Sequence, residues 1–344
     1  MNDDDRSRDG ERVPSRTYSE EPARPRAAHG TSRRQWLAAG AAGIAAGLAH
    51  PAVGRSVGAA AAPSQRFKLS LNTSTIRGQQ KTLPEIIELA AAAGYDGIEP
   101  WIAELESYRE GGGDLAELRR RIEDAGLEVV SAIGFAPWIV EDASARRRGL
   151  EQARRDMDLV RQIGGRRIAA PPVGAHREGR VELDAAAERF AALVDVGRQA
   201  GVAPQLELWG FSKTLSRLCE LLYVAAAAKT GDFGILLDVY HLYKGGSDFE
   251  SLSLVGGQVM HVFHVNDYPA QPPRESIRDA DRVFPGDGVA PLERIFRTLA
   301  HSGFDGYLSL ELFHPDYWKR DAGEVCREGF RKLQAALAGA AEGP

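Results

Sequence analysis

Cysteine is scarce in this sequence: Cys219 and Cys326 are the only two among 344 residues. Small exported domains without a large core are held together by several disulfides, so two cysteines in helix-like stretches exclude a disulfide framework. Hydrophobic residues make up 43% of the chain, enough to bury the core of one large domain or two ordinary ones. The core must therefore stabilise the fold without covalent cross-links.

Positive charge is not in excess either. The formal net charge is -5 and the isoelectric point is near 6.0. A protein that grips nucleic acid needs a basic surface to neutralise phosphates, and this chain has no general basic field. We therefore expect no nucleic-acid partner and consider small solutes the natural ligands.

The N-terminal region lacks an uninterrupted apolar run of membrane-spanning length. Residues 1–30 are rich in Asp, Arg, Ser, Pro and Gly, a composition typical of a disordered leader. Paired Arg33 and Arg34 then precede an Ala/Gly-rich apolar run that ends at Leu48, and residues 57–62 offer small-residue cleavage sites. We assign residues 1–65 to a leader with a targeting segment, outside the folded domain.

This targeting segment resembles a twin-arginine export signal. The resemblance implies transport of the folded protein by the twin-arginine translocase to a periplasmic or extracellular location. A membrane anchor is the alternative, but Gly40, Gly43 and Gly47 interrupt the run and His50-Pro51 ends it. If the signal is not cleaved, it would tether the protein to the membrane.

From residue 67 onward, short apolar strands alternate with amphipathic helices. Several helices close on a glycine just before the next strand, as in AAAGYDGIE and EDAGLEVV, which is a helix C-terminal signal. We predict eight strands, at residues 67–72, 97–101, 127–133, 166–170, 203–208, 233–238, 260–265 and 306–311. Helices are predicted between them, for example at 83–93, 114–125, 149–163, 183–200 and 291–302.

Eight strand–helix units in one α/β domain over residues 66–342 predict a single (β/α)8 TIM barrel. A doubly wound open sheet is the alternative. The chain has no Gly-rich phosphate loop after its first strand, which disfavours that fold. A barrel places its active site at the C-terminal ends of the strands, so the residues at those ends are the first candidates.

Four consecutive predicted strands end in candidate ligands: Glu207, Asp238, His264 and Glu311. Side chains alternate between the two faces of a strand. In the eighth strand the leucines fall on one face and Glu311 on the other, which directs the carboxylate inward. The fifth strand repeats this arrangement around Glu207.

Alternation also separates the two histidines of the seventh strand, His261-Val-Phe-His264. Residues at an odd separation point to opposite faces, so these two rings cannot share one ligand site. His264 lies at the rim with the inward parity of Met260 and Val262, whereas His261 shares the outward face of Phe263. We therefore predict His264 as the ligand.

The cluster nearly requires a cation. A single strand-end carboxylate often caps the next helix, and a single histidine on an apolar strand is often structural. Three carboxylates converging on one rim, however, repel one another unless a positive ion lies among them. Three oxygen ligands and one imidazole suit Mn²⁺ first, with Mg²⁺, Co²⁺ or Zn²⁺ as alternatives.

The order Glu, Asp, His, Glu on strands five to eight resembles the xylose-isomerase-like TIM barrel superfamily, and within it the inosose isomerase-like branch of sugar phosphate isomerases and epimerases. The similarity includes the Asp238-x-x-His241 pattern and the segment DADRVFPGDG at 279–288. It implies that Glu207, Asp238, His264 and Glu311 bind the metal. By the same resemblance, Glu207 and Glu311 are acid and base, and His241 and Arg282 bind substrate. Barrels of this family often pair, so a homodimer is an open alternative.

Other residues near strand ends are weaker candidates. Trp101, Trp138, Trp209 and Tyr240 could stack on a sugar or simply pack at the rim. Glu99 shares the parity of Trp101 and could bind substrate or cap a loop. Asp267 follows the ligand histidine closely, and we expect it to orient that imidazole. The sequence shows no phosphate-binding cluster and no second ring of acids for a second metal.

These features predict a divalent-metal-dependent isomerase or epimerase that acts on a keto-sugar or keto-polyol. A divalent ion bound by adjacent carbonyl and hydroxyl oxygens favours loss of the neighbouring proton and stabilises the resulting enediolate. Loss of a β-substituent after the same first step gives a lyase that cleaves 3-keto-glycosides, which is the alternative that export favours. A non-catalytic periplasmic sugar-binding barrel is the second class.

Overall fold

The computed structural model describes residues 67–177 and 179–342, so the leader and signal assigned to residues 1–65 lie outside the described residues. The eight strands are β1 (Lys68–Asn72), β2 (Gly97–Glu99), β3 (Glu128–Val129), β4 (Arg167–Ala170), β5 (Ala203–Glu207), β6 (Gly234–Asp238), β7 (Met260–Val265) and β8 (Tyr307–Leu310). All eight predicted strands are confirmed, although β2 and β3 are shorter than expected.

Helices follow the strands as predicted. The α-helices are α1 (Leu83–Ala93), α2 (Ile102–Glu110), α3 (Leu115–Asp124), α4 (Ala143–Gln162), α5 (Leu183–Ala200), α6 (Leu218–Ala227), α7 (Val239–Gly245), α8 (Leu292–His301) and α9 (Ala322–Glu342). Short 3₁₀ helices are η2 (Thr73–Gln79), η3 (Phe249–Leu254), η4 (Gly257–Val259), η5 (Asp279–Asp281) and η6 (Tyr317–Lys319). Glycines with positive φ end α1 at Gly94 and α5 at Gly201, because only glycine adopts this conformation without strain.

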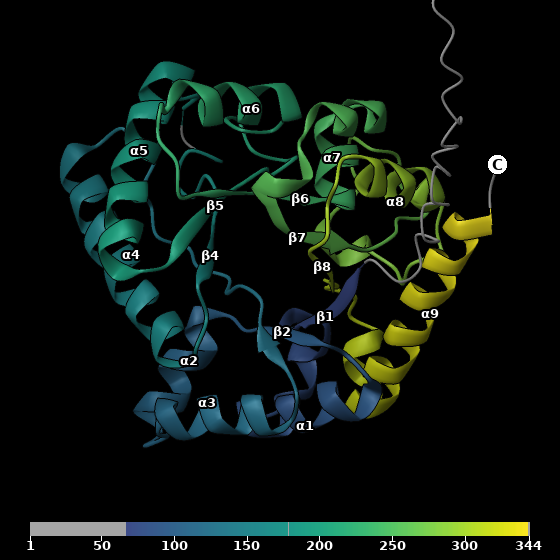
Figure 1. Cartoon of the computed structure of the whole chain (residues 1–344). Helices are drawn as coiled ribbons and strands as arrows, with labels where there is room; N and C mark the ends of the chain where they lie inside the picture. Colours follow the sequence, from purple (N-terminus) through teal and green to yellow (C-terminus); the bar gives the residue numbers. More distant parts are fainter. Residues whose placement is uncertain (1–66, 178, 343–344) are drawn as a thin grey trace, which may run out of the picture. The chain divides into compact units, whose positions relative to one another are not determined.

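The strands form one parallel sheet in the order β3-β2-β1-β8-β7-β6-β5-β4. Figure 1 shows this sheet as a ring of strands with helices around it. The ring closes just past β3, where Ala132 donates from N to the Arg167 carbonyl at 3.2 Å and accepts from Ala169 N at 2.8 Å. The α/β TIM barrel predicted from the sequence is therefore confirmed.

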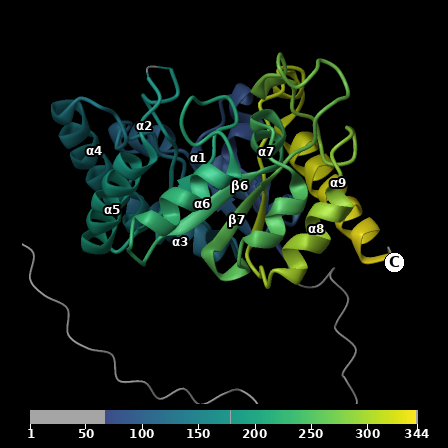
Figure 2. The ribbon, with the colours of Figure 1, turned by 90° about the horizontal axis from the view of Figure 1, so that it is seen from above.

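Residues inside and outside the ring alternate along each strand. Leu236, Val262 and Tyr307 belong to a small apolar cluster inside the barrel. Their neighbours Leu237, Phe263 and Leu308 join the larger core between strands and helices. In Figure 2, β6 and β7 run side by side, and their in-register pairs include Asp238 with His264. The same parity that puts leucines against helices thus points the polar strand ends inward.

In the part of the chain that the structure describes, every helix is too short or too polar to cross a bilayer.

Candidate metal centre and active site

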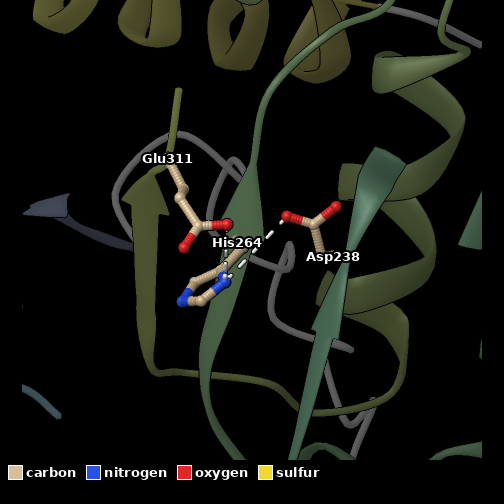
Figure 3. A group of neighbouring side chains, drawn as sticks. All are labelled: Asp238, His264 and Glu311. Atoms are coloured by element: carbon tan, nitrogen blue, oxygen red, sulfur yellow. Dashed lines mark ion pairs between the residues drawn. The ribbon is translucent and has the colours of Figure 1, made fainter. Parts of the chain in front are cut away.

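Three of the four predicted ligands converge at the C-terminal ends of adjacent strands. Asp238 ends β6, His264 lies in β7 and Glu311 directly follows β8 (Figure 3). One potential ligand atom from each residue lies within 4.8 Å of the others. His264 Nδ1 is 3.4 Å from Glu311 Oε2 and 3.9 Å from Asp238 Oδ2. All three side chains are buried, so little solvent screens the charges of the cluster.

The imidazole is oriented for metal binding. His264 Nε2 lies 2.9 Å from Glu99 Oε2, while Nδ1 is buried and has no hydrogen-bond partner. Since Glu99 accepts from Nε2–H, Nδ1 is the ring nitrogen that faces Asp238 and Glu311. A carboxylate that holds the far nitrogen of a ligand histidine is a common feature of metal sites. The donor set and the unpartnered nitrogen therefore fit a divalent cation.

The charges around the ring favour a positive species at His264 Nδ1, which is either a proton or a cation that takes its place. Burial alone would lower the pKa of His264, but the Glu311 and Glu99 carboxylates raise that pKa well above its ordinary value. Burial would raise the pKa of Glu311, but His264 and Arg282 hold it below its usual range. The carboxylate of Glu311 is therefore stabilised in its charged form by the positive groups around it.

Arg282 supplies one of those positive groups. Its side chain is 1% exposed, and Nη1 donates to Glu311 Oε2 at 2.6 Å and to Asp238 Oδ2 at 3.1 Å. The guanidinium also lies over the Tyr240 ring, 4.4 Å from its centroid. The sequence predicts that Arg282 binds substrate, and the structure places it in the cavity wall with its charge directed at Asp238 and Glu311, two of the predicted metal ligands.

His241 and Tyr240 lie beneath this guanidinium. His241 Nε2 is 3.2 Å from Arg282 Nη2, and because arginine only donates, the imidazole accepts there. Burial and the Arg282 charge lower the pKa of His241, which favours the neutral ring. The His241 backbone N–H donates to Asp238 Oδ1 at 2.8 Å, so Asp238 also caps α7. Tyr240 is 1% exposed and donates to the Ile277 carbonyl, which assigns it to packing under the rim.

Glu207, the fourth predicted ligand, lies in the wall of the same cavity but outside the group of three. Its Oε1 accepts from Trp209 Nε1 at 3.0 Å, while Oε2 is buried and has no hydrogen-bond partner. Burial raises the pKa of Glu207 to about 8, and the negative charge of Glu311 adds to the rise. Glu207 thus differs from Glu311: it has one free carboxyl oxygen and is readily protonated.

The placement of Glu99 corrects our expectation that it contacts substrate or caps a loop. Glu99 is 0% exposed, and its Oε2 accepts from Asn72 Nδ2, Ser309 Oγ and His264 Nε2. Glu99 therefore holds the His264 ring through its Nε2 atom, on the side away from Asp238 and Glu311. Asn72 Nδ2 also donates to Glu311 Oε1 at 3.1 Å, so one amide orients two acids of the site.

The sequence predicts that Asp267 orients the His264 imidazole, but in the structure it does not. Instead its carboxylate accepts from the backbone N–H groups of Tyr268, Gly286, Gly288 and Ala290. These bonds fix the loop that follows Arg282. The prediction was wrong because the partners of Asp267 come about 20 residues later in the chain, in a loop whose path the sequence does not reveal.

Two amides in the site were not identified from the sequence. Asn266 accepts from Tyr240 N and donates to Asp238 Oδ2 at 2.8 Å, so it orients that ligand. Asn72 plays the corresponding role for Glu311. Both follow the inward parity of their strands, but an amide alone carries no metal-binding signal.

Aromatic rings enclose the cavity above the cluster, which has a volume of about 210 Å³. Trp101 and Trp209 line it, as predicted. Sequence reasoning missed the other three aromatic residues of the wall, Phe135, Phe211 and Phe313. Each lies a few residues past a strand end, and that position was the available signal.

Trp138 lies elsewhere and corrects another expectation. Its side chain is 1% exposed, packs against Phe190 and donates from Nε1 to the Pro171 carbonyl at 2.9 Å. The chain has left the barrel rim by this residue, so the indole belongs to the outer core. His261 also lies away from the cluster, half-buried at the start of β7 against the ring of Tyr307.

Comparisons with known proteins agree with this geometry. Residues 87–336 match the family model described as "Xylose isomerase-like TIM barrel". An inosose isomerase from Bacillus velezensis is 27% identical over 277 residues, which cover 79% of this chain and 97% of the relative. A 3-dehydroshikimate dehydratase from Pseudomonas aeruginosa is 27% identical over 275 residues, 77% of this chain but 41% of the relative. The solved structure of an IolI protein with a bound zinc atom superimposes with a TM-score of 0.73 at 22% identity, over 79% of this chain and 99% of that one.

Proposed function

Since the chain belongs to the xylose isomerase-like TIM barrel family, we propose that it is a divalent-metal-dependent isomerase or epimerase of a keto-sugar or keto-polyol. The observation that carries the proposal is one cavity with two acids in its wall, Glu207 and Glu311, beside the Asp238–His264–Glu311 cluster. The relatives that the chain resembles include an inosose isomerase, which supports a polyol-like substrate.

We propose Mn²⁺ as the native ion. Asp238, His264 and Glu311 would hold it, with Glu207 at the fourth position. Carboxylate oxygens with one imidazole suit Mn²⁺, and a related fold with bound zinc keeps Zn²⁺ open. When bound, the ion supplies Lewis acidity that makes the C–H next to a substrate carbonyl more acidic.

Glu207 is the better proton carrier of the two acids. Its Oε2 is free of protein partners, whereas both oxygens of Glu311 accept hydrogen bonds, from Asn72 and from Arg282. A carboxylate with one oxygen free of protein partners can take a proton from a bound substrate and return it. Trp209 holds the other oxygen of Glu207 and so fixes the direction of the free one.

The positions of Glu207 and Glu311 determine whether a proton can be removed from one side of the substrate and returned to the other. Glu207 comes from β5 and Glu311 follows β8, three places apart in the strand order, so they reach the cavity from different sides. Removal of a proton by one acid and return by the other gives epimerisation. Return to the neighbouring carbon gives isomerisation. Arg282 and His241 line the same cavity, and we propose that they bind substrate oxygens.

A deuterium experiment tests this function. The full-length protein is loaded with Mn²⁺ and incubated in D₂O with free keto-sugars, inososes and 3-keto-glucosides. We expect deuterium at a carbon next to the carbonyl, and we expect Glu207→Gln to abolish it. Glu188→Gln, an exposed change on α5, is the matched control and should exchange normally. Full exchange by Glu207→Gln would refute the assignment.

A lyase or dehydratase is the second candidate. The 27% identity to a 3-dehydroshikimate dehydratase favours it, since elimination begins with the same proton removal. Mass spectrometry of the D₂O reactions separates the two: an isomerase returns a product with the substrate's composition in which deuterium replaces hydrogen, and a lyase releases the β-substituent. A non-catalytic sugar-binding barrel would bind sugar tightly after complete metal removal and would exchange nothing.

We also propose export through the twin-arginine translocase, supported by the Arg33-Arg34 segment. Replacing both arginines by lysine should retain the protein inside the cell, and N-terminal sequencing of the exported form would locate any cleavage. Export of the paired-lysine variant at the normal level would overturn this proposal.

A further inference from the structure

A second, larger cavity adjoins the cavity of the metal centre. It has a volume of about 940 Å³ and is lined by residues of η2, by the start of α1, by α2 and by the glycine loop 111–113. We call it the side cavity, and the 210 Å³ space above the cluster the metal cavity. Small-molecule sites usually measure roughly 300–1,000 Å³. The metal cavity alone falls below that range, and the side cavity lies near its upper end.

The two cavities share a wall. Trp101 and Phe135 line both of them, with ring centroids 5.0 Å apart and planes inclined by 45°. Trp101 Nε1 donates to Asn72 Oδ1 at 2.9 Å, which holds the indole in place. A ligand that occupies the metal cavity and extends along these rings enters the side cavity directly.

Arg77 gives the side cavity a polar recognition group. Its guanidinium stacks on Trp101, 3.5 Å from the ring centroid, and lies 5.8 Å from the centroid of Phe313 in the metal cavity. Its Nη2 is buried and has no hydrogen-bond partner. The nearby acid, Glu104, instead accepts from Thr73 Oγ1 at 2.6 Å and from Trp101 N at 3.0 Å. A buried donor without an acceptor is costly, which indicates that a ligand oxygen completes it.

The remaining lining is mostly neutral. Tyr108 lines the cavity, and its ring packs against Gly113, where an added Cβ would lie 2.4 Å from the ring. Lys81 reaches Glu85 at 3.2 Å and is therefore paired. A lining that combines an indole, a phenyl and a phenol ring with one guanidinium suits a neutral ring-shaped group with an oxygen acceptor.

We propose that the side cavity is a second subsite, which binds a ring group attached to the sugar or polyol in the metal cavity. The substrate is then a glycoside or another two-ring keto compound, and Arg77 Nη2 donates to an oxygen of its second ring. This inference rests on the proposed function for the location of the first ring. It narrows the substrate class from free monocyclic keto-sugars to compounds with two linked rings.

Binding of unreactive probes tests the subsite. Calorimetry on the full-length protein with Mn²⁺ compares two one-ring probes, glucose and myo-inositol, with two two-ring probes, cellobiose and 4-nitrophenyl β-glucopyranoside. We expect a two-ring probe to bind about tenfold more tightly or better. Preference for cellobiose identifies a glycosyl group as the natural second ring, and preference for the nitrophenyl glycoside identifies an aryl group.

Two variants locate the effect. Ala103 is exposed on α2 and lines the side cavity, so Ala103→Trp fills the space without disturbing the core. It should remove the two-ring advantage while one-ring binding stays within about twofold. Arg77→Met should reduce two-ring binding about tenfold by removing the donor. Ala116→Trp, at an exposed position on α3, is the matched control and should change neither.

The outcomes separate this inference from the proposed function. Equal affinity for one-ring and two-ring probes, or an advantage that survives Ala103→Trp, overturns the subsite even if monocyclic keto-sugars exchange deuterium normally. If no keto compound exchanges, the proposed function fails. A two-ring advantage lost in Ala103→Trp would then still establish the subsite.

Discussion

The two halves of the barrel contribute different parts of the site. The half from β5 to β8 supplies Glu207 and the clustered side chains of Asp238, His264 and Glu311, which are oriented by hydrogen bonds. The half from β1 to β4 supplies the rings of Trp101 and Phe135 and the large side cavity. The clustered residues thus come from one half, and the side cavity comes mainly from the other. Changes in the cluster should alter metal binding, and changes in the lining of the side cavity should alter the size of the ligand that binds.

The largest effect is expected from Asp238→Asn. Asparagine retains an oxygen for the α7 cap but removes the charge that a cation needs. We expect Mn²⁺ affinity to fall by more than about 100-fold, because even residues outside the ligand set often contribute 10–100-fold. Calorimetry on the full-length protein measures it. Asp124→Asn, exposed at the end of α3, should bind Mn²⁺ normally, and unchanged affinity in Asp238→Asn would contradict the cluster.

Glu99→Gln tests the carboxylate that the β1–β4 half contributes next to His264. Glutamine keeps the shape but weakens the hydrogen bond from His264 Nε2, so Mn²⁺ affinity should fall about 10- to 100-fold. The same titration measures it. An affinity equal to that of the parent protein would show that Glu99 plays no part in orienting the ligand.

Asp267→Asn should affect stability rather than metal affinity. One oxygen becomes an amino group that faces the N–H groups of Gly286 and Gly288, so two donors lose their acceptor. We expect the free energy of unfolding to fall by about 2–4 kcal/mol, measured by urea denaturation. A loss of Mn²⁺ affinity as large as that of Glu99→Gln, with stability unchanged, would restore the role that the sequence suggested.

The smallest effect concerns Asp156, on α4 in the half without metal ligands. This carboxyl is 2% exposed, and its Oδ2 has no hydrogen-bond partner. Burial raises its pKa to about 7, and the Glu106 charge adds to the rise. The folded state therefore holds this proton more tightly than the unfolded state, whose carboxyl titrates near pH 4. Stability from this group is complete below about pH 4 and is lost as the pH rises through 7.

Asp156→Asn removes that titration. At pH 8 the variant should be more stable than the parent by about 1–2 kcal/mol, and the difference should vanish below about pH 4. Urea denaturation at several pH values measures both. A constant difference across this range would show that Asp156 does not titrate as described.

Sequence reasoning succeeded where strand parity decides. Alternation along β7 separated His264 from His261, and the polar ends of β5, β6 and the segment after β8 came out facing the interior. Parity holds because the strand geometry is fixed by the backbone alone. The barrel could therefore be predicted, together with the location of the cluster, although β2 and β3 are shorter than expected and α4 begins earlier.

Sequence reasoning failed where the chain leaves the strands. Trp138 and Asp267 both follow strand ends closely, yet one packs in the outer core and the other ties down a distant loop. Loop paths depend on tertiary contacts that have no period in the sequence. For the same reason the rings of Phe135, Phe211 and Phe313 were not assigned to the cavity wall.

Asn72 joins the two halves of the site. Its Oδ1 accepts from Trp101, which borders the side cavity. Its Nδ2 donates to Glu311 of the Asp238–His264–Glu311 cluster and to Glu99, which holds His264. If the second ring of a substrate shifts the Trp101 indole on binding, the shift reaches Glu99 and Glu311 through the amide of Asn72. Thermodynamic linkage then requires reciprocity: the factor by which the second ring tightens the metal equals the factor by which the metal tightens the second ring.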